Sequence, residues 1–139
     1  MKQSVRKNTH HDDVKVKRGI SGFGLFAKRA FARGEQIIEY RGERISEKEG
    51  DRRGNLYIMG VSPRVNIDGS PRWNIARYAN HSCAPNAEAV DYSGRVYIVA
   101  KRRIREGEEI TYHYGKDYFD KIIFPKGCRC VQCGEGKDT

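Results

Sequence analysis

Short runs in which apolar and polar residues alternate recur along this chain, and this pattern is typical of β-strands that bury one face. Near the start, Val14 and Val16 alternate with Lys15 and Lys17. Comparable apolar runs predict further strands at residues 25–27, 37–42, 55–61, 64–68, 87–92, 95–103 and 109–114. Turn residues lie between these runs, above all in the glycine-rich stretch 18–24. We therefore expect a chain built mainly of short strands.

Two stretches carry the signals that begin a helix. Ser70 is a residue type favoured as an N-cap, and Pro71 is favoured at the first helical position, so we expect a helix from there toward Ala79. Ser46 is followed three residues later by Glu49, which resembles a capping box and predicts a second short helix over residues 46–52. We find no internal repeat and no low-complexity linker, so the sequence predicts one domain with polar ends.

The composition supports a mainly β fold with short helices. The chain has 12 Ile and 9 Val but only 2 Leu. Because β-branched side chains fit a pleated surface and lose rotamer freedom in helices, this balance favours sheet.

The net charge of the chain indicates which kinds of partner it could bind. There are 27 Lys and Arg against 18 Asp and Glu, which gives a net charge of +9. Such a charge would suit contact with nucleic acid, a nucleosome or an acidic protein. No apolar stretch reaches the roughly 18 residues of a membrane span, and the first residues lack the apolar block of a secretory signal. We expect a soluble, intracellular protein without a membrane partner.

The four cysteines predict a zinc site. Cys128, Cys130 and Cys133 lie within six residues, and Cys83 is the remaining cysteine. Because structural Zn²⁺ usually takes four ligands, the triplet lacks one, which Cys83 can supply. The expected site joins the C-terminal segment to the middle of the chain. Disulfides or free thiols are the alternative, and a reducing intracellular setting disfavours the disulfides.

Three further segments stand out together: Gly22-Phe23-Gly24, Asn80-His81-Ser82-Cys83 with Pro85-Asn86, and residues 107–115, Gly-Glu-Glu-Ile-Thr-Tyr-His-Tyr-Gly. Their order and spacing, with Tyr40-Arg41-Gly42 and the final cysteines, resemble the SET-domain protein lysine methyltransferases from about residue 15 to 133. The resemblance implies a β-rich SET fold, or β-clip-like fold, of several small sheets with a pseudoknot-like chain crossing at the active site. It implies a SET domain at 14–117 and a post-SET-like zinc-binding tail at 118–139, and the polar residues 1–13 before them are expected to form a flexible tail.

The same resemblance implies methyl transfer from S-adenosylmethionine to a lysine of a protein or peptide, such as a histone tail. The implied cofactor-binding residues are Gly22, Phe23, Gly24, Tyr57, Arg77, Asn80, His81 and Tyr114. The implied catalytic residues are Tyr114, whose hydroxyl would lie beside the methyl and sulfonium, with Tyr40 and Tyr112. Tyr40 would line the lysine channel. The family varies between Phe and Tyr at the position of Tyr112, where a tyrosine would favour one or two methyl additions over three.

A second hypothesis is a non-catalytic, basic, zinc-containing module that binds nucleic acid or an acidic partner, with aromatic side chains as stacking surfaces. Such a binder has no reason to combine Tyr114 and the Asn80-His81 pair with a glycine turn, so the enzyme is favoured. Two alternatives stay open. A second copy of the chain could complete the substrate surface as a homodimer, and the protein could act in a bacterial cytoplasm or in the nucleus and chromatin of a eukaryotic host.

Overall fold

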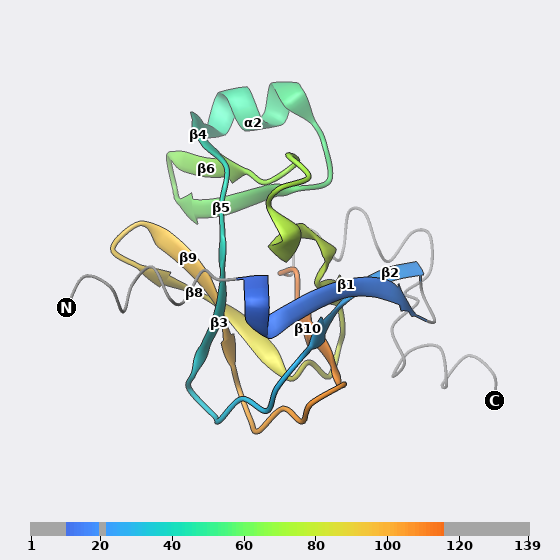
Figure 1. Cartoon of the computed structure of the whole chain (residues 1–139). Coiled ribbons are helices and arrows are strands. Elements are labelled where there is room, and N and C mark those ends of the chain that lie inside the picture. Colours follow the sequence, from blue (N-terminus) through green and yellow to red (C-terminus); the bar gives the residue numbers. More distant parts are fainter. Residues whose placement is uncertain (1–10, 20–21, 116–139) are drawn as a thin grey trace, which may run out of the picture.

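Short strands form most of the computed structural model, which describes residues 11–19 and 22–115 (Figure 1). The strands are β1 (Val14–Gly19), β2 (Gly22–Ala27), β3 (Gln36–Tyr40), β4 (Glu43–Ser46), β5 (Ile58–Ser62), β6 (Val65–Asp68), β7 (Asn80–His81), β8 (Ala87–Tyr92), β9 (Arg95–Ala100) and β10 (Glu109–Tyr112). The helices are α2 (Glu47–Arg53) and two 3₁₀ turns, η1 (His11–Asp13) and η2 (Ile75–Tyr78). The expectation of a β-rich fold with short helices is confirmed.

The described strands pair in three small sheets, with the orders β1-β2-β10-β7, β3-β9-β8 and β4-β6-β5. The third sheet lies beside α2 at the top of Figure 1, and the other two lie below it. No helix in the described part of the chain is both long and apolar enough to cross a membrane.

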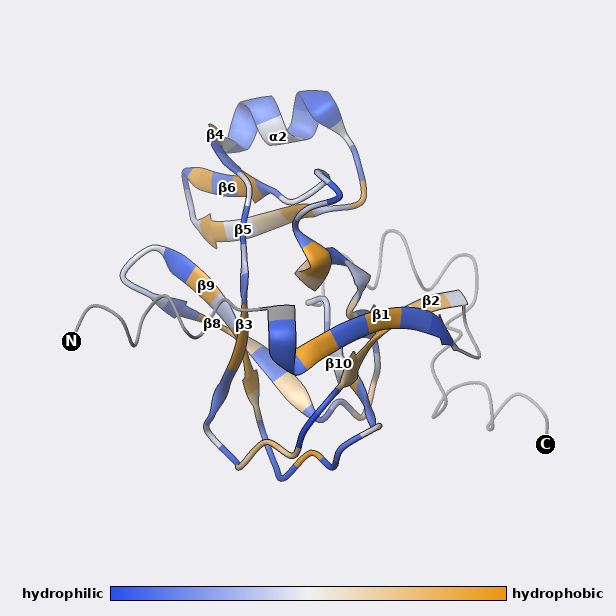
Figure 2. Cartoon of the chain, viewed as in Figure 1, coloured by the Kyte–Doolittle hydropathy of each residue, from blue (hydrophilic) through white to orange (hydrophobic). Residues whose placement is uncertain are grey.

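The core contains many β-branched residues, and most of its largest buried side chains are isoleucines. Its largest fully buried side chains are Phe31, Leu25, Ile37, Ile38, Ile98, Ile104 and Ile110. These come from strands of two sheets and from the bridge that joins Phe31 to Ile104. Figure 2 shows the contrast between the apolar segments of β3 and β9 and the polar surface of α2. The core therefore lies among the sheets, and α2 covers an outer face.

The helix predicted from Ser46 and Glu49 is confirmed as α2. The Ser46 hydroxyl accepts a hydrogen bond from the Glu49 amide at 3.0 Å, which satisfies one of the free N–H groups at the helix start. The helix ends at Gly54, which adopts a left-handed conformation with a φ of 61°.

The helix predicted to start at Pro71 is wrong in type and place, because only the 3₁₀ turn η2 forms, from Ile75. The reason is Asn74, whose buried side chain donates to the Gly69 carbonyl and accepts from the Arg41 amide, both at 3.0 Å. An asparagine that bonds to backbone outside its own turn competes with helix formation. The local Ser-Pro signal is overridden by these two tertiary bonds.

Strand β10 determines where the C-terminal part of the domain lies. It pairs antiparallel with β2 and parallel with β7, so it lies between two segments that come much earlier in the chain. The buried Asn86 side chain holds it there by donating to the Glu109 carbonyl at 2.7 Å and accepting from the Thr111 amide at 2.9 Å. This pairing places residues 112–115 beside β7.

Candidate active site

Asn80 joins the glycine turn to the C-terminal strand. Its side-chain nitrogen donates to the Phe23 carbonyl at 2.9 Å and to a carboxylate oxygen of Glu109 at 2.8 Å. The same carboxylate lies against Gly24, where a Cβ would come within 2.5 Å of Glu109 Oε2 and would displace it. The segments predicted to bind cofactor, residues 22–24 and 80–81, are therefore neighbours.

His81 supports the backbone of Tyr114. Its Nδ1 accepts a hydrogen bond from the Tyr114 amide at 3.1 Å, so its proton is on Nε2, which lies 3.5 Å from the Cys83 sulfur. Burial, together with the nearby His113, lowers the pKa of His81 to about 4. The imidazole is neutral at pH 7 and acts as a fixed acceptor between β7 and the chain after β10.

Tyr114 lies between the two halves of the site. Its hydroxyl donates to the Ala79 carbonyl at 2.7 Å. Its ring packs edge-on against His81, with 5.4 Å between the ring centres, and tilted against Tyr112 at 5.0 Å. Because the hydroxyl proton is used on a backbone carbonyl, the phenol oxygen offers lone pairs to its surroundings.

The Tyr40 side chain is held in a similar way to that of Tyr114. Its hydroxyl donates to the Tyr57 carbonyl at 2.8 Å. Its ring lies against Gly69, where an added Cβ would come within 2.4 Å of the ring. Burial, reinforced by Tyr114 and Tyr57, raises the pKa of Tyr40 well above its usual range. The phenol therefore stays protonated and keeps this hydrogen bond.

These side chains surround a cavity of about 370 Å³. It is lined by Tyr40, Leu56, Tyr57, Ile58, Met59, Gly60, Arg77, Tyr112, Tyr114 and Gly115. Five of the predicted site residues thus share one pocket. Gly22, Phe23, Gly24, Asn80 and His81 do not line it, and His81 contacts the pocket residue Tyr114.

Arg77 lines the pocket and carries a positive charge. Its guanidinium lies 4.0 Å from the centre of the Tyr57 ring and 5.2 Å from that of Tyr78, and one of its terminal nitrogens donates to the Ser70 carbonyl. Its Nε is buried and has no hydrogen-bond partner among the described residues. A buried donor of this kind is suited to an acceptor on a bound molecule.

The predicted zinc site is described only in part. Cys83 is half-buried and lies next to His81, whereas Cys128, Cys130 and Cys133 fall outside the described residues. Within residues 11–19 and 22–115, no group of three or more His, Cys, Asp and Glu is placed to hold a metal ion. The predicted tail at 118–139 also lies outside the described residues.

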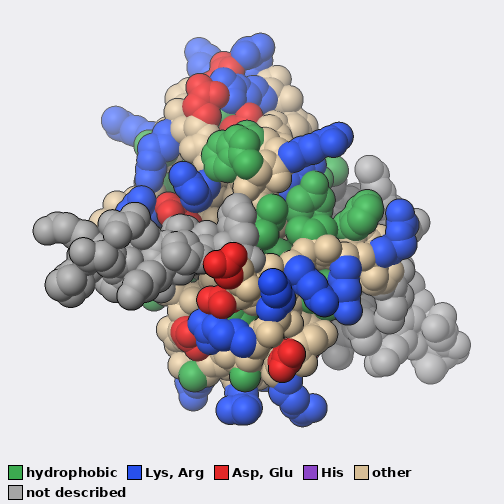
Figure 3. All heavy atoms as spheres, in the orientation of Figure 1, with side chains coloured by type: hydrophobic (Ala, Val, Ile, Leu, Met, Phe, Trp, Pro, Cys, Tyr) green, Lys and Arg blue, Asp and Glu red, His purple; other side chains and the backbone are tan. Residues whose placement is uncertain are grey.

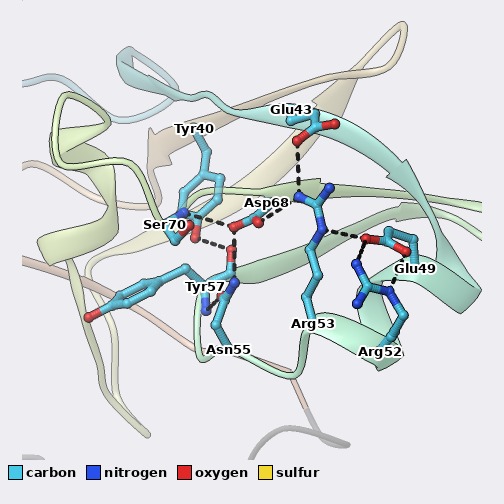
Figure 4. A network of polar contacts seen from close by, with 9 residues as sticks. All are labelled: Tyr40, Glu43, Glu49, Arg52, Arg53, Asn55, Tyr57, Asp68 and Ser70. Carbon is cyan, nitrogen blue, oxygen red and sulfur yellow. Dashed lines mark hydrogen bonds and ion pairs between the residues drawn. The ribbon is translucent and has the colours of Figure 1, made fainter.

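Sequence reasoning missed several polar residues that support the site. Glu109 accepts a hydrogen bond from Asn80 and lies next to Gly24. Asp68 and Asn55 belong to a hydrogen-bond network behind Tyr57 (Figure 4). Glu109 lies inside a quoted motif, which could have drawn attention to it. Asp68 and Asn55 are 13 residues apart and carry no periodic signal.

One face of the molecule combines apolar and basic groups. Figure 3 shows apolar side chains gathered in the middle of one face, with Lys and Arg around them. Phe23 on the glycine turn and Leu56 at the pocket are each 53% exposed. Exposed apolar groups beside a pocket are typical of ligand or partner contact.

Comparison with known proteins agrees with this geometry. Residues 22–115 match the family model of the SET domain. The histone-lysine N-methyltransferase trithorax of Drosophila virilis is 38% identical over 96% of this chain and 4% of its own length. The histone-lysine N-methyltransferase, H3 lysine-4 specific, of Emericella nidulans is 38% identical over 68% of this chain and 9% of its own length. Its counterpart in Schizosaccharomyces pombe is 37% identical over 68% of this chain and 12% of its own length.

The chain thus spans between 4% and 12% of the length of these relatives. The matched region begins at Gly22 of the glycine turn and ends at Gly115, directly after Tyr114. It therefore contains β7, β10 and every residue that lines the pocket. The chain belongs to the SET-domain family.

Proposed function

We propose that this chain transfers a methyl group from S-adenosylmethionine to the side-chain nitrogen of a protein lysine, with a histone as the substrate. One observation carries the proposal: the hydroxyls of Tyr40 and Tyr114 both donate to backbone carbonyls, at 2.8 and 2.7 Å. Their oxygens are therefore left as acceptors at the pocket. Acceptors suit a cationic methyl donor and an incoming amine, whose N–H and polarised C–H groups both donate.

The residues present fit this cofactor. Gly22 has a φ of 100°, and apart from its chain neighbours no atom of the described residues lies within 4 Å of where its Cβ would be, so its backbone can approach a ligand closely. The buried Nε of Arg77 lacks an acceptor among the described residues, and a carboxylate would provide one. Gly22, Phe23, Gly24, Asn80 and His81 would hold the cofactor on one side of Tyr114, with Tyr57 and Arg77 on the other. When bound, the cofactor supplies a methyl carbon activated by a positive sulfur.

The pocket would select a neutral lysine. Among the described residues that line it there is no carboxylate and one cation, Arg77. A free lysine has a pKa of about 10.4, and both burial and a nearby positive charge favour loss of its proton. Tyr40 and Tyr114 would then align the amine, and positioning of this kind supplies much of the rate. The amine would form the new N–C bond as the S–C bond of the donor breaks to give a thioether, and the surplus proton would pass from the methylated amine to solvent.

The relatives named above give the substrate class, because their names describe histone-lysine methyltransferases and two of them specify lysine 4 of histone H3. A histone substrate implies action at chromatin in a eukaryotic nucleus. Tyr112, which is buried and packs against Tyr114, would limit the product to one or two methyl groups. Mass spectrometry of the product checks this, and mainly trimethylated lysine would contradict it.

The test of the function is binding followed by transfer. Calorimetry should detect S-adenosylmethionine binding, and labelled cofactor should mark histone H3. The variant Tyr114→Phe removes one hydroxyl and should bind cofactor normally yet lose turnover by roughly a hundredfold, as when one preorganised polar group is removed from an active site. Tyr92→Phe is the matched control, because Tyr92 is 43% exposed and packs against Tyr97. Absence of both binding and transfer in the native chain would favour the basic binding module.

The same proposal includes one zinc ion held by Cys83, Cys128, Cys130 and Cys133. Supporting it, the Nε2–H of His81 faces the Cys83 sulfur at 3.5 Å, which suits a metal-bound thiolate that accepts a hydrogen bond. Zinc would close the chain over the site from the side of Cys83. Elemental analysis should find about one zinc per chain and a loss of it in Cys83→Ser. Full zinc content in that variant would contradict the ligand set.

A further inference from the structure

Asp68 is the centre of a polar network that lies behind the pocket (Figure 4). One of its carboxylate oxygens accepts from the Ser70 amide at 3.0 Å and from the Asn55 side chain at 3.2 Å. The other accepts from the Arg53 guanidinium at 2.9 Å. The Asp68 side chain is only 10% exposed, so its donors replace most of the water that the charge would otherwise require.

Asn55 carries this arrangement to Tyr57. Its side-chain oxygen accepts from the Tyr57 amide at 2.7 Å, which forms an Asx turn. The Tyr57 carbonyl in turn accepts from the Gly69 amide at 2.9 Å and from the Tyr40 hydroxyl at 2.8 Å. The backbone N–H and the carbonyl of Tyr57 are thus both fixed. A chain of hydrogen bonds leads through them from the Asp68 carboxylate to the Tyr40 hydroxyl.

We propose that Asn55 and Asp68 are positioning residues, which orient the Tyr40 hydroxyl through the backbone of Tyr57. The inference rests on the proposed function, because it assigns the Tyr40 oxygen to the lysine amine. Neither Asn55 nor Asp68 lines the pocket, so neither touches the reacting groups. A shift of a pocket wall by a fraction of an ångström is enough to slow an in-line transfer.

The outer members of the network provide a control. Glu43 contacts Arg53 at 3.0 Å, and its side chain is 65% exposed. Exposed ion pairs contribute little to stability, and Glu43 makes no contact with Asn55 or Tyr57 in Figure 4. Glu43→Gln therefore changes the charge of the same network without moving the turn at Asn55.

The experiment is a double-mutant cycle on the full chain, with histone H3 as substrate and turnover expressed per S-adenosylmethionine-binding site. Asn55→Ala should lower kcat by about tenfold in the native background. In the Tyr40→Phe background it should lower kcat by less than about twofold, because the hydroxyl that it orients is gone. Glu43→Gln should leave kcat unchanged in both backgrounds.

A merely structural role gives a different result, since unfolding lowers the number of binding sites and not the turnover of each site. Equal losses from Asn55→Ala in both backgrounds, or an unchanged kcat in the native one, would overturn the inference. If Asn55→Ala does not fold, Asn55→Asp replaces it in the same cycle, because it keeps the acceptor for Tyr57 and replaces the donor to Asp68 with a carboxylate that repels it. A native chain that binds no S-adenosylmethionine contradicts the proposed function itself, before any variant is compared.

Discussion

Gly69→Ala tests the packing that holds Tyr40 in place. A Cβ at this position would lie 2.4 Å from Cε1 and 2.5 Å from Cζ and Oη of Tyr40, far inside van der Waals contact. Tyr40 is 3% exposed, so its ring has little space into which to move. Overpacking of this kind costs about 1–3 kcal/mol, and loss of the bond from Tyr40 to the Tyr57 carbonyl adds about 1 kcal/mol.

The expected loss of unfolding free energy is therefore roughly 2–4 kcal/mol, which lowers Tm by roughly 6–12 °C in a domain of this size. Thermal unfolding followed by circular dichroism measures the change, and the methylation rate should fall with it. Gly60→Ala is the stability control, because its nearest new contact is Asn66 Oδ1 at 3.8 Å, and its Tm should stay level or rise slightly.

The expected loss of stability comes from the clash between the new methyl group and the Tyr40 ring. In a Tyr40→Leu background, which removes the atoms that the new methyl meets, Gly69→Ala should lose most of its effect on Tm. A Tm for Gly69→Ala within about 2 °C of the native chain, or an equal loss in both backgrounds, would refute it.

Two further predictions concern the polar groups that support the fold. Asn86→Ala should lower the free energy of unfolding by roughly 2–4 kcal/mol, because Asn86 is buried and bonds twice to β10; denaturant unfolding measures this, and an unchanged midpoint would contradict it. Hydrogen bonds from Arg52 and Arg53 lower the pKa of Glu49 from 4.5 to about 2, so Glu49 stabilises the folded state above pH 4.5 and loses this effect as the pH falls toward 2. Glu49→Gln should flatten the acid dependence of Tm in that window, and an unchanged slope would contradict this.

Local patterns in the sequence were sufficient to predict those elements whose stabilising contacts are also local. The apolar runs at residues 87–92 and 95–103 predict two strands, which form as β8 and β9 and pair along their full length from Ala87–Ala100 to Tyr92–Arg95. Ser46 and Glu49 predict the cap of α2 because the hydrogen bond joins residues three apart. The motif at residues 107–115 indicates the site because Tyr112 ends strand β10 and Tyr114 follows two residues later.

Features that depend on distant partners could not be predicted in this way. Asn74 replaces a helix with a 3₁₀ turn through a bond to Arg41, 33 residues away. The position of β10 depends on pairing with Leu25 and His81, which no local pattern encodes. The network behind Tyr57 likewise joins Asn55 to Asp68, whose residue types are common in turns. The roles of the individual pocket residues stay predictions until the variants are measured.

The insertion of β10 between β2 and β7 also affects how the protein is made. As the nascent chain leaves the ribosome, β2 and β7 emerge well before their shared neighbour at Glu109–Tyr112. Until then β2 keeps an open edge on one side, and the pocket lacks the walls that Tyr112 and Tyr114 supply. Synthesis must therefore pass residue 115 before the pocket can close, and a premature stop upstream of β10 would leave an aggregation-prone fragment for chaperones.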